Sequence, residues 1–545
     1  MKIALCQINP IIGDITGNKQ KIIDGYKKSI NSGVELVVFP ELAVCGYPPQ
    51  DLVEKQEFRE AVKKAADEIA SVTGDAAVIF GSITDNLDDI GPDVHNSAIV
   101  AMHGKICFEQ HKTLLPNYDV FDEVRYFEAS SDNKVFIFNG KKIGISICED
   151  IWNDADYWNK RRYYVDPVQK LIKQGAEILI NISASPYAFG KRTERMKMLS
   201  VISANDKLPI IYTCCAGAQT DLIFDGASMC FDNYGKLCLL GKSFQEDLLF
   251  FDTEADYKQI DKCEGKFEEE VLNALIYGLK EYCNKTGFKK AILGLSGGID
   301  SALVAFIAVK ALGSQNVHAL LMPSQFSSEG SVSDSVQLAK NLNISYDTIP
   351  IQPAFEKTLN LLEPFFGNLP FGVAEENLQS RIRGLFLMAF SNKFGYLLCT
   401  TGNKSEMAVG YATLYGDMNG ALGIIADIYK TQVYQISEYI NRDEEIIPRA
   451  IIDKAPSAEL RPNQTDQDSL PPYELLDKIL KMYLEENKEI EEISQIIGER
   501  EVVRKVLKLV DFNEFKRKQA APVLRVSVKA FGYGRRYPIV QGWRK

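Results

Sequence analysis

The sequence predicts two α/β domains: an N-terminal α-β-β-α sandwich and a C-terminal doubly wound parallel sheet. The chain has 545 residues, which is too long for a single hydrophobic core. Its first 252 residues contain many short apolar runs typical of strands and few helical patterns. Beyond residue 266 strand and helix patterns alternate, as they do in open parallel sheets. Residues 253–266 lose apolar periodicity and gain charge, which predicts a linker.

The first 252 residues show the strand patterns of a two-layered β structure. Apolar strands are expected at residues 2–7, 34–39, 76–83, 97–103, 134–138, 142–148, 178–183, 210–214 and 227–231. Amphipathic helices are expected at 18–32 and 58–72. Because strands greatly outnumber helices, we expect two sheets inside and helices outside.

The second half has the alternation of a parallel sheet. A helix at 267–286 leads into a strand at 291–295, a glycine-rich loop and a helix at 302–312. Further strands are expected at 317–322, within 343–351 and at 396–400, and further helices near 331–341, 374–393 and 430–441. Ligands of such sheets bind at the carboxyl ends of the strands. Residues 412–472 are rich in Gly, Pro, Asp and Asn, and we expect parts of them to form mobile lids that substrate orders.

Composition excludes several classes of protein. The net charge of −11 argues against a general nucleic-acid binder. The 11 cysteines lack C-x-x-C spacing and the four histidines lack zinc-ligand spacing, so reduced thiols and no zinc site are expected. Residues 2–7 resemble a strand rather than a signal peptide, and the apolar run 291–313 is interrupted by charges. We therefore expect a cytoplasmic protein with no nucleic-acid or membrane partner.

The loop Ser-Gly-Gly-Ile-Asp-Ser at 296–301 is the most informative stretch. A turn between a strand and a helix directs backbone N–H groups and the positive end of the helix dipole towards one point. The glycines allow an anion to approach, and the Ser296 and Ser301 hydroxyls add donors. Asp300 suits a Mg²⁺ that accompanies phosphate. The alternative is a structural turn; the loop is not a Walker-A motif, because no Gly-Lys-Ser/Thr follows.

Three residues at predicted strand ends could form a nucleophilic centre. Glu41 follows the strand 34–39, Lys112 lies between a histidine and a Thr-Leu-Leu-Pro run, and Cys148 ends the strand 142–148. With so few histidines, a carboxylate would have to take the thiol proton, and a lysine would stabilise the oxyanion. Read singly, the cysteine fits a core position and the two charges fit a solvated rim.

Three further segments of the second half carry candidate ligands. Thr401 and Glu406 follow the strand 396–400, and Glu406 could share Mg²⁺ with Asp300, although a polar turn and helix cap explain them equally. Lys430 stands at a helix start, where cations are disfavoured, which indicates an anionic ligand unless the lysine is simply solvated. The basic segment around Lys516 could meet a dinucleotide's phosphates or be a solvated face.

The quoted residues resemble known families. Glu41, Lys112 and Cys148 match the Glu–Lys–Cys triad of the nitrilase superfamily, in which they are the general base, the transition-state lysine and the nucleophile that forms a thioester. The loop 296–301 resembles the pyrophosphate loop of ATP pyrophosphatases. Segments 46–52, 112–123 and 183–191 resemble the glutaminase domain of glutamine-dependent NAD⁺ synthetases.

This resemblance implies the roles of the remaining residues. Glutamine would be held by Tyr118, Ser185 and Lys191, with Ser183, Glu123 and Glu149 in support. Segments 374–384, 400–406, 414–417, 457–462 and 469–473 resemble the synthetase domain of the same family. ATP would be bound by Gly294, Leu295, Ser296, Gly297, Gly298, Ile299, Asp300, Ser301, Thr401 and Lys430. Deamido-NAD⁺ would be bound by Asn377, Glu406 and Lys516, and Mg²⁺ by Asp300 and Glu406. The sequence departs from the family pattern at Ser380 and Ala455, neither of which carries chemistry.

The resemblance implies a nitrilase-like glutaminase domain at 1–252 and, at 267–545, a Rossmann-like synthetase domain of the adenine nucleotide alpha hydrolase type with a C-terminal tail. It implies a ligase that amidates deamido-NAD⁺ through an adenylate, with glutamine, ATP and deamido-NAD⁺ as small-molecule partners. It also implies a homo-octamer and a sheltered path for ammonia. The alternatives are a GMP-synthetase-like amidotransferase, an RNA-modifying relative, or a nitrilase-type amidase with a regulatory nucleotide-binding domain. A GMP-synthetase-like enzyme would need a Cys–His glutaminase pattern, which this sequence does not contain. An RNA-modifying relative would need basic or zinc-binding appendages, which it also lacks.

Overall fold

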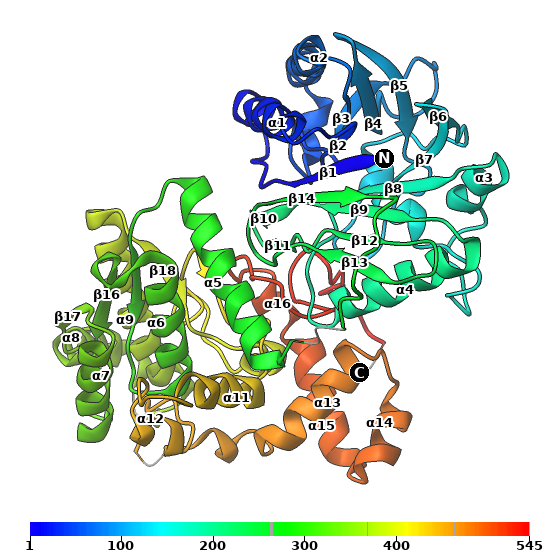
Figure 1. The fold of residues 1–545 in the computed structure, drawn as a ribbon. Helices are drawn as coiled ribbons and strands as arrows, with labels where there is room; N and C mark the ends of the chain where they lie inside the picture. The colour runs from blue at the N-terminus through cyan, green and yellow to red at the C-terminus, as the bar shows by residue number, and fades with distance from the viewer. Residues whose placement is uncertain (262–264, 368, 463, 544–545) are drawn as a thin grey trace. The chain divides into compact units, whose positions relative to one another are not determined.

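The computed structural model describes residues 1–261, 265–367, 369–462 and 464–543. The chain divides into two compact units, Met1–Glu264 and Gly265–Lys545 (Figure 1). Residues 262–264 of the predicted linker, residue 463 of the predicted lid segment, and residues 368 and 544–545 of the predicted C-terminal domain lie outside the described residues. The domain boundaries stay a prediction.

The N-terminal unit contains two six-stranded sheets. The first has the order β14 (Asp247–Asp252), β1 (Lys2–Gln7), β2 (Leu36–Val38), β3 (Ala77–Asp85), β4 (Val94–Met102), β5 (Lys105–His111). The second has the order β13 (Leu237–Leu240), β12 (Met229–Phe231), β9 (Ile210–Cys214), β8 (Ile178–Ser183), β7 (Lys141–Ile147), β6 (Val135–Phe138). β1, β2 and β3 are parallel, as are β7, β8 and β9. A short ribbon joins β10 (Ala216–Gln219) and β11 (Leu222–Asp225).

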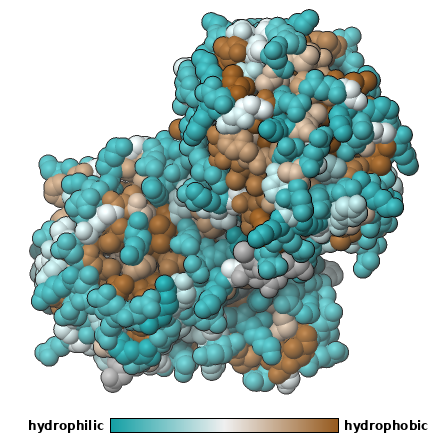
Figure 2. Space-filling view, in the orientation of Figure 1, coloured by the Kyte–Doolittle hydropathy of each residue, from teal (hydrophilic) through white to brown (hydrophobic). Residues whose placement is uncertain are grey.

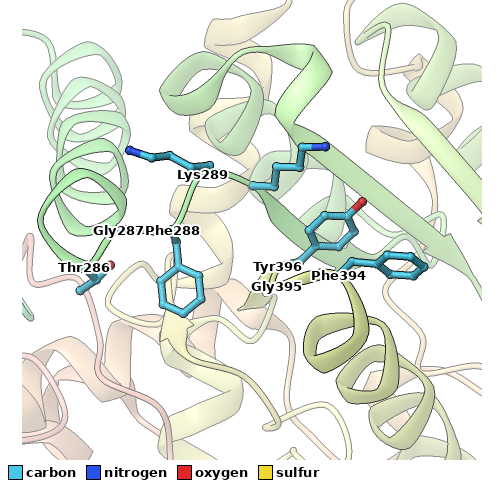
Figure 3. Close-up of a pocket in the computed structure, with 8 residues that line it drawn as sticks. Thr286, Gly287, Phe288, Lys289, Phe394, Gly395 and Tyr396 are labelled. Atoms are coloured by element: carbon cyan, nitrogen blue, oxygen red, sulfur yellow. The ribbon is translucent and has the colours of Figure 1, made fainter.

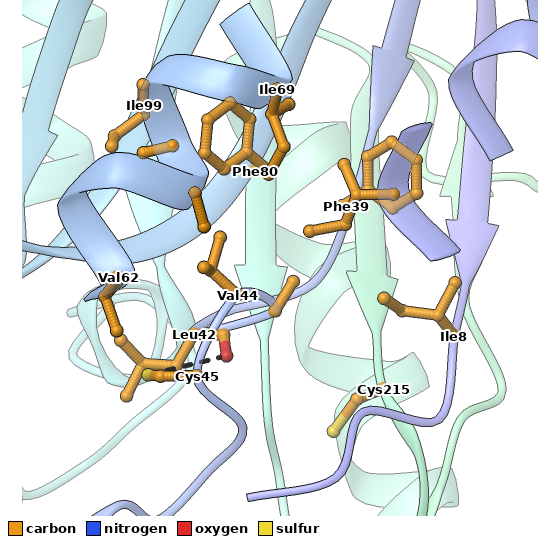
Figure 4. Close-up of a cluster of buried hydrophobic side chains, with 14 of the residues drawn as sticks. Ile8, Phe39, Leu42, Val44, Cys45, Val62, Ile69, Phe80, Ile99 and Cys215 are labelled. Atoms are coloured by element: carbon orange, nitrogen blue, oxygen red, sulfur yellow. Dashed lines mark hydrogen bonds between the residues drawn. The ribbon is translucent and has the colours of Figure 1, made fainter. Parts of the chain in front are cut away.

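Alternating side chains along the strands build three apolar layers. Ile3 of β1 and Ile180 of β8 lie in one cluster between the sheets. Ala4 belongs to a cluster on the opposite face, where α1 (Ile15–Ile30) and α2 (Gln56–Ser71) cover the first sheet. Figure 4 shows Val62 and Ile69 of α2 in this cluster with Phe80 of β3. Leu179 likewise faces α3 (Pro167–Lys173) and α4 (Lys191–Asp206) on the second sheet. The predicted α-β-β-α sandwich is confirmed.

The sequence analysis did not predict β5, β10, β11, β13, β14, α3 or α4 of this unit, and in β5 and α4 charged residues obscure the pattern. β5 alternates exposed and partly buried residues at the edge of its sheet. α4 buries Arg195, whose Nη2 donates to Asp225 Oδ2 at 2.6 Å. A buried arginine is normally read from sequence as a solvated residue, so the helix appears to lack an apolar face.

The C-terminal unit is built on a five-stranded parallel sheet with the order β17 (Ser345–Thr348), β16 (Val317–Leu321), β15 (Ala291–Gly294), β18 (Leu397–Thr400), β19 (Leu422–Gly423). On one face lie α5 (Phe267–Thr286), α6 (Ile299–Leu312), α7 (Glu329–Asn341) and α11 (Lys430–Ile440), and on the other lie α8 (Gln352–Phe366) and α9 (Val373–Phe394) (Figure 1). The chain order runs outward from β15 and then returns to β18, so the predicted doubly wound sheet is confirmed.

A helical layer follows the sheet. α10 (Lys404–Val409), α13 (Tyr473–Leu484), α14 (Ile490–Ile497) and α15 (Arg500–Phe512) share one apolar cluster. α12 (Arg449–Asp453) lies against α6 and α7, and α16 (Glu514–Arg517) follows α15. The predicted lid segment 412–472 contains β19, α11 and α12; its mobility stays a prediction.

The surface carries mostly hydrophilic side chains on the face shown in Figure 2, with separate apolar patches. In the described ranges, none of the helices has the length and apolar character needed to cross a bilayer. Every described cysteine is a free thiol.

Candidate active sites

The ends of three strands bring Glu41, Lys112 and Cys148 into one buried centre. Glu41 lies in the turn after β2, Lys112 directly follows β5, and Cys148 directly follows β7. Their exposed fractions are 1%, 0% and 6%. Cys148 has a positive φ of 42°, so the chain turns sharply at the sulfur into a 3₁₀ turn, Cys148–Ile151. Such a turn holds a nucleophile in a defined orientation at the end of a strand.

Hydrogen bonds fix both oxygens of Glu41. Lys112 Nζ lies 2.7 Å from Glu41 Oε1, and Asn96 Nδ2 donates to the same oxygen at 2.8 Å. The backbone N–H of Ala184 donates to Oε2 at 2.8 Å. The turn that carries Glu41 packs so closely on Gly81 of β3 that a Cβ there would lie 2.5 Å from the Glu41 carbonyl carbon.

Glu123 is a second carboxylate on Lys112. Its oxygens lie 2.9 and 2.8 Å from Lys112 Nζ, and Tyr47 donates to Oε1 at 2.8 Å. Burial alone would lower the pKa of Lys112, but Glu123 and Glu41 outweigh it and hold that pKa well above its ordinary value. Burial also raises the pKa of Glu123 to about 7, against the opposing effect of Lys112. The centre therefore contains a permanent ammonium flanked by two carboxyl groups.

Cys148 is a thiol in this environment. Burial raises its pKa well above the ordinary value, the negative charge of Glu41 adds to the effect, and Lys112 opposes it. A thiol of this kind needs a base at the moment of attack. The nearby carboxylate of Glu41 is suited to that role.

The residues matched to glutamine binding lie around the same strand end. Tyr118 donates to Glu149 Oε1 at 2.9 Å, and Tyr163 donates to the same atom at 3.0 Å. Ser185 is buried two residues after β8, and Lys191 opens α4 with its ammonium 3.7 Å from the centre of the Trp152 ring. Positive and negative groups thus stand near Cys148, as an amino acid zwitterion requires.

Asp150 holds the strand ends together, a role that the sequence analysis missed. Its Oδ1 accepts from the N–H groups of Thr113 and Leu114 at 3.0 and 2.8 Å, and its Oδ2 accepts from Ile147 at 3.0 Å. One buried carboxylate therefore joins the chain next to Lys112 to the chain next to Cys148. The sequence does not reveal this role, because all three partners of Asp150 are backbone N–H groups.

In the C-terminal unit, the loop after β15 has the predicted shape. Gly298 caps α6, and Gly297 has a φ of 76° with space for no side chain, because a Cβ would lie 2.5 Å from the Ser331 carbonyl oxygen. Ser301 Oγ donates to the Gly298 carbonyl at 2.9 Å and lies 3.2 Å from Ser296 Oγ. These contacts hold the backbone N–H groups at the start of α6 open to an anion.

Asp300, Lys430 and Glu406 meet at this loop. The Lys430 ammonium forms an ion pair with Asp300 and lies 3.7 Å from Glu406 Oε1. Asn403 Nδ2 donates to Asp300 Oδ1 at 2.9 Å. Burial and the charge of Asp300 raise the pKa of Glu406 to about 8. Lys430 is buried against these two carboxylates, so it is not a solvated lysine.

Asp300 and Glu406 fit a Mg²⁺ ion. Both line one cavity, and burial together with the charge of Asp300 raises the pKa of Glu406, so a bound cation would favour its ionised form. Across the described ranges, no three or more His, Cys, Asp and Glu residues gather as a complete metal site. Substrate phosphates and water would therefore complete the coordination, as is usual for Mg²⁺.

The cavity at the carboxyl ends of β15, β16 and β18 has a volume of about 280 Å³. Nearly all of the predicted ATP ligands line it, from Gly294 to Ser301 except Gly297, together with Thr401 and Lys430. Glu406, predicted to bind deamido-NAD⁺ and Mg²⁺, lines it as well. Asn377 lies one contact away, because its Oδ1 accepts from Thr413, which lines the cavity. Lys516 Nζ donates to the carbonyls of Gly410 and Ala412, the two neighbours of the lining residue Tyr411. Arg383 also lines the cavity, and the sequence analysis did not single it out.

A second hollow lies at the amino ends of β15 and β18, between Thr286–Lys290 and Phe394–Tyr396 (Figure 3). It contains none of the predicted site residues.

Family models match each of the two units. A family model described as carbon-nitrogen hydrolase matches residues 2–260, and one described as NAD synthase matches residues 271–520. The glutamine-dependent NAD(+) synthetase of Synechocystis sp. is 47% identical over 550 residues, with 99% of each chain covered. That of Thermotoga maritima is 41% identical, covering 100% of this chain and 99% of the relative.

Solved structures agree as well. The structure of a glutamine-dependent NAD+ synthetase from Acinetobacter baumannii in complex with ADP has a TM-score of 0.78 and 38% identity, covering 99% of both chains. A second, from Cytophaga hutchinsonii, shares the fold with a TM-score of 0.83 at 22% identity over 99% of this chain and 98% of the other. Two chemical centres on two matching folds, together with relatives of this identity over the whole length, lead to one conclusion: the chain belongs to the family of glutamine-dependent NAD(+) synthetases.

Proposed function

We propose that this chain releases ammonia from glutamine at the Glu41–Lys112–Cys148 centre and uses it to amidate deamido-NAD⁺ at the phosphate loop. The proposal rests mainly on the 2.7 Å contact between Lys112 Nζ and Glu41 Oε1 beside the strand-end thiol. This arrangement supplies a nucleophile, a base and a fixed positive charge without histidine.

At the first centre, Glu41 takes the Cys148 proton as the sulfur attacks the side-chain amide carbon of glutamine. An S–C bond forms, and the Lys112 ammonium stabilises the oxyanion. Glu41 then returns the proton to the amide nitrogen, the C–N bond breaks, and ammonia leaves a thioester. Water, deprotonated by Glu41, attacks the thioester and releases glutamate and the Cys148 thiol. Tyr118, Ser185 and Lys191 hold glutamine, and Glu149 would accept a hydrogen bond from its α-ammonium group.

At the second centre, the nicotinate carboxylate of deamido-NAD⁺ attacks the α-phosphorus of ATP. A C–O–P linkage forms and pyrophosphate leaves, held by the N–H groups of residues 296–301 and by Lys430. Ammonia then attacks the activated carbonyl carbon, AMP leaves, and the new amide loses a proton. Thr401 adds a contact to ATP, while Asn377, Glu406 and Lys516 hold deamido-NAD⁺. Asp300 and Glu406 would hold Mg²⁺, which neutralises phosphate charge when bound.

A homo-oligomer, an octamer by resemblance to the long bacterial members of the family, belongs to the same proposal. Its support is a group of exposed apolar side chains at the end of α8 and the start of α9: Leu361, Phe365, Leu369, Phe371 and Val373. Exposed apolar groups of this kind mark interfaces more often than free surface. Light scattering of the purified protein tests it, and a monomer at working concentration would contradict it.

Product analysis tests the proposed reaction. With deamido-NAD⁺, ATP and either glutamine or ammonium, the protein should form NAD⁺, AMP and pyrophosphate. Asp300→Ala should abolish synthesis from both donors and leave glutamine hydrolysis intact. Formation of ADP and phosphate instead would show that no adenylate is made.

A further inference from the structure

The cavity of the C-terminal unit is lined by three cations, two of which are already paired. Among the described residues these are Lys430, Lys454 and Arg383. Lys430 pairs with Asp300 and Glu406. Lys454 Nζ lies 2.7 Å from Glu459 Oε1. Arg383 has no ion pair within 4.0 Å in the described part of the chain, so its charge faces the cavity without a matching carboxylate.

The carboxylates nearest to Arg383 are occupied by other groups. Glu459 Oε1 accepts from Ser331 Oγ at 2.7 Å in addition to its pair with Lys454. Asp417 Oδ1 accepts from the Thr413 N–H at 2.6 Å. Both act on Arg383 only over a longer range, where they oppose the burial that lowers its pKa to about 10. At neutral pH the guanidinium is charged.

One hydrogen bond fixes the orientation of Arg383. Its Nε donates to the Met322 carbonyl, just beyond the carboxyl end of β16, at 3.1 Å. The neighbouring residue on α9, Gly384, would bring a Cβ within 2.9 Å of the Tyr415 carbonyl oxygen, so α9 has little freedom to shift. The two Nη groups make no hydrogen bond to the described chain. A guanidinium held by Nε, with both Nη groups available, is suited to bidentate binding of an oxyanion.

We propose that Arg383 binds an oxyanion of a substrate, either a phosphate of ATP or an acidic group of deamido-NAD⁺, at the wall of the cavity formed by α9. The inference rests on the proposed function. Both reactants are anions, and their approach in a partly buried site is repulsive unless positive charge is supplied. Lys430 is held by Asp300 and Glu406 at the loop, and Arg383 supplies the unpaired charge on the α9 side.

The test uses ammonium-driven synthesis, which does not depend on Cys148. Arg383→Met should raise the KM of one substrate about 10- to 100-fold, because a charge-assisted bidentate contact is lost. Arg383→Lys, which keeps the positive charge but cannot donate two parallel hydrogen bonds, should show a smaller rise of the same KM. Lys393→Met, which removes an exposed cation from the same helix, should behave as wild type.

The two substrates are then separated by equilibrium titration. Weaker binding of ATP alone assigns Arg383 to the triphosphate, and weaker binding of deamido-NAD⁺ alone assigns it to the dinucleotide. If both KM values and both dissociation constants of Arg383→Met stay within about two-fold of wild type, the inference is wrong. It is also wrong if Lys393→Met causes the same change, or if only kcat falls. If Arg383→Met does not fold, Arg383→Lys alone decides: an unchanged KM for both substrates overturns the inference. Failure of the wild-type protein itself to make NAD⁺ would instead refute the proposed function.

Discussion

Replacement of Asp150 by asparagine should impair glutamine hydrolysis without affecting synthesis from ammonium. The buried carboxylate accepts three backbone N–H groups, from Thr113, Leu114 and Ile147, at 2.8 to 3.0 Å. Asparagine has one acceptor oxygen, which can keep the first two bonds. Its amide nitrogen would then face the Ile147 N–H, and two donors would oppose each other immediately before Cys148.

The expected loss of stability and activity follows from this one lost hydrogen bond. One buried N–H left without an acceptor reduces the free energy of unfolding by about 1–3 kcal/mol. Lys112 is adjacent to Thr113 and Cys148 is adjacent to Ile147, so loss of the link through Asp150 can separate the two catalytic residues. A displacement of about 1 Å between them is expected to lower glutaminase kcat/KM roughly 100-fold. Ammonium-driven synthesis should stay within about two-fold of wild type, since it uses the other unit.

The assay compares glutamate release, ammonium-driven NAD⁺ formation and thermal unfolding. Asp232→Asn is a matched control: its Oδ1 accepts the N–H groups of Tyr234 and Lys236, both at 2.9 Å, in the turn between β12 and β13. Because one asparagine oxygen can accept both of these bonds, that variant should keep its stability and its glutaminase activity. If Asp150→Asn loses stability but hydrolyses glutamine as wild type does, Asp150 does not position the centre.

Three further variants test separate parts of the structure. Gly297→Ala should reduce synthesis from either donor at least about 10-fold in a product assay while sparing glutamate release, because φ is 76° and a Cβ would lie 2.5 Å from a backbone carbonyl oxygen. Burial lowers the pKa of His111 from 6.5 to about 4, so the folded state favours the neutral ring and stability is lost as the pH falls from 6.5 through 4. His111→Gln should remove up to about 3 kcal/mol of that loss, measured by urea unfolding at neutral and acidic pH; an unchanged pH dependence would contradict this. Lys404→Met leaves Asp427 and Glu485, which pair with Lys404 at 2.9 and 2.7 Å, without their shared cation. It should destabilise the C-terminal unit by about 3–5 kcal/mol, read as a lower melting temperature, and an unshifted transition would show that the pair is dispensable.

The sequence predicted the layers of both folds because alternating apolar residues record which strand face is buried. For example, the neighbouring residues Ile3 and Ala4 of β1 are buried on opposite faces of the sheet. It also predicted Glu41 and Cys148 at strand ends, since each closes a predicted apolar strand, whereas β5, the strand before Lys112, was not predicted. Among the elements that it missed, α4 has a buried charge, that of Arg195.

The contacts between site residues could not be predicted from the sequence. Asp150 binds only backbone N–H groups, and the separation along the chain between it and Thr113 carries no signal. Arg383 appears in the sequence as one of two similar arginines on α9, and only the bond from its Nε to Met322 shows that it is turned to the cavity edge. Lys430 was predicted at a helix start, but its carboxylate partners come from α6 and α10.

The central claim is that one chain contains an ammonia-producing centre and a separate amide-forming centre. Measurement of NAD⁺ formation by Cys148→Ala with glutamine and, in parallel, with ammonium tests it most directly. The account predicts that synthesis from glutamine disappears while synthesis from ammonium continues at the wild-type rate. Equal loss with both donors, or continued synthesis from glutamine, would contradict it.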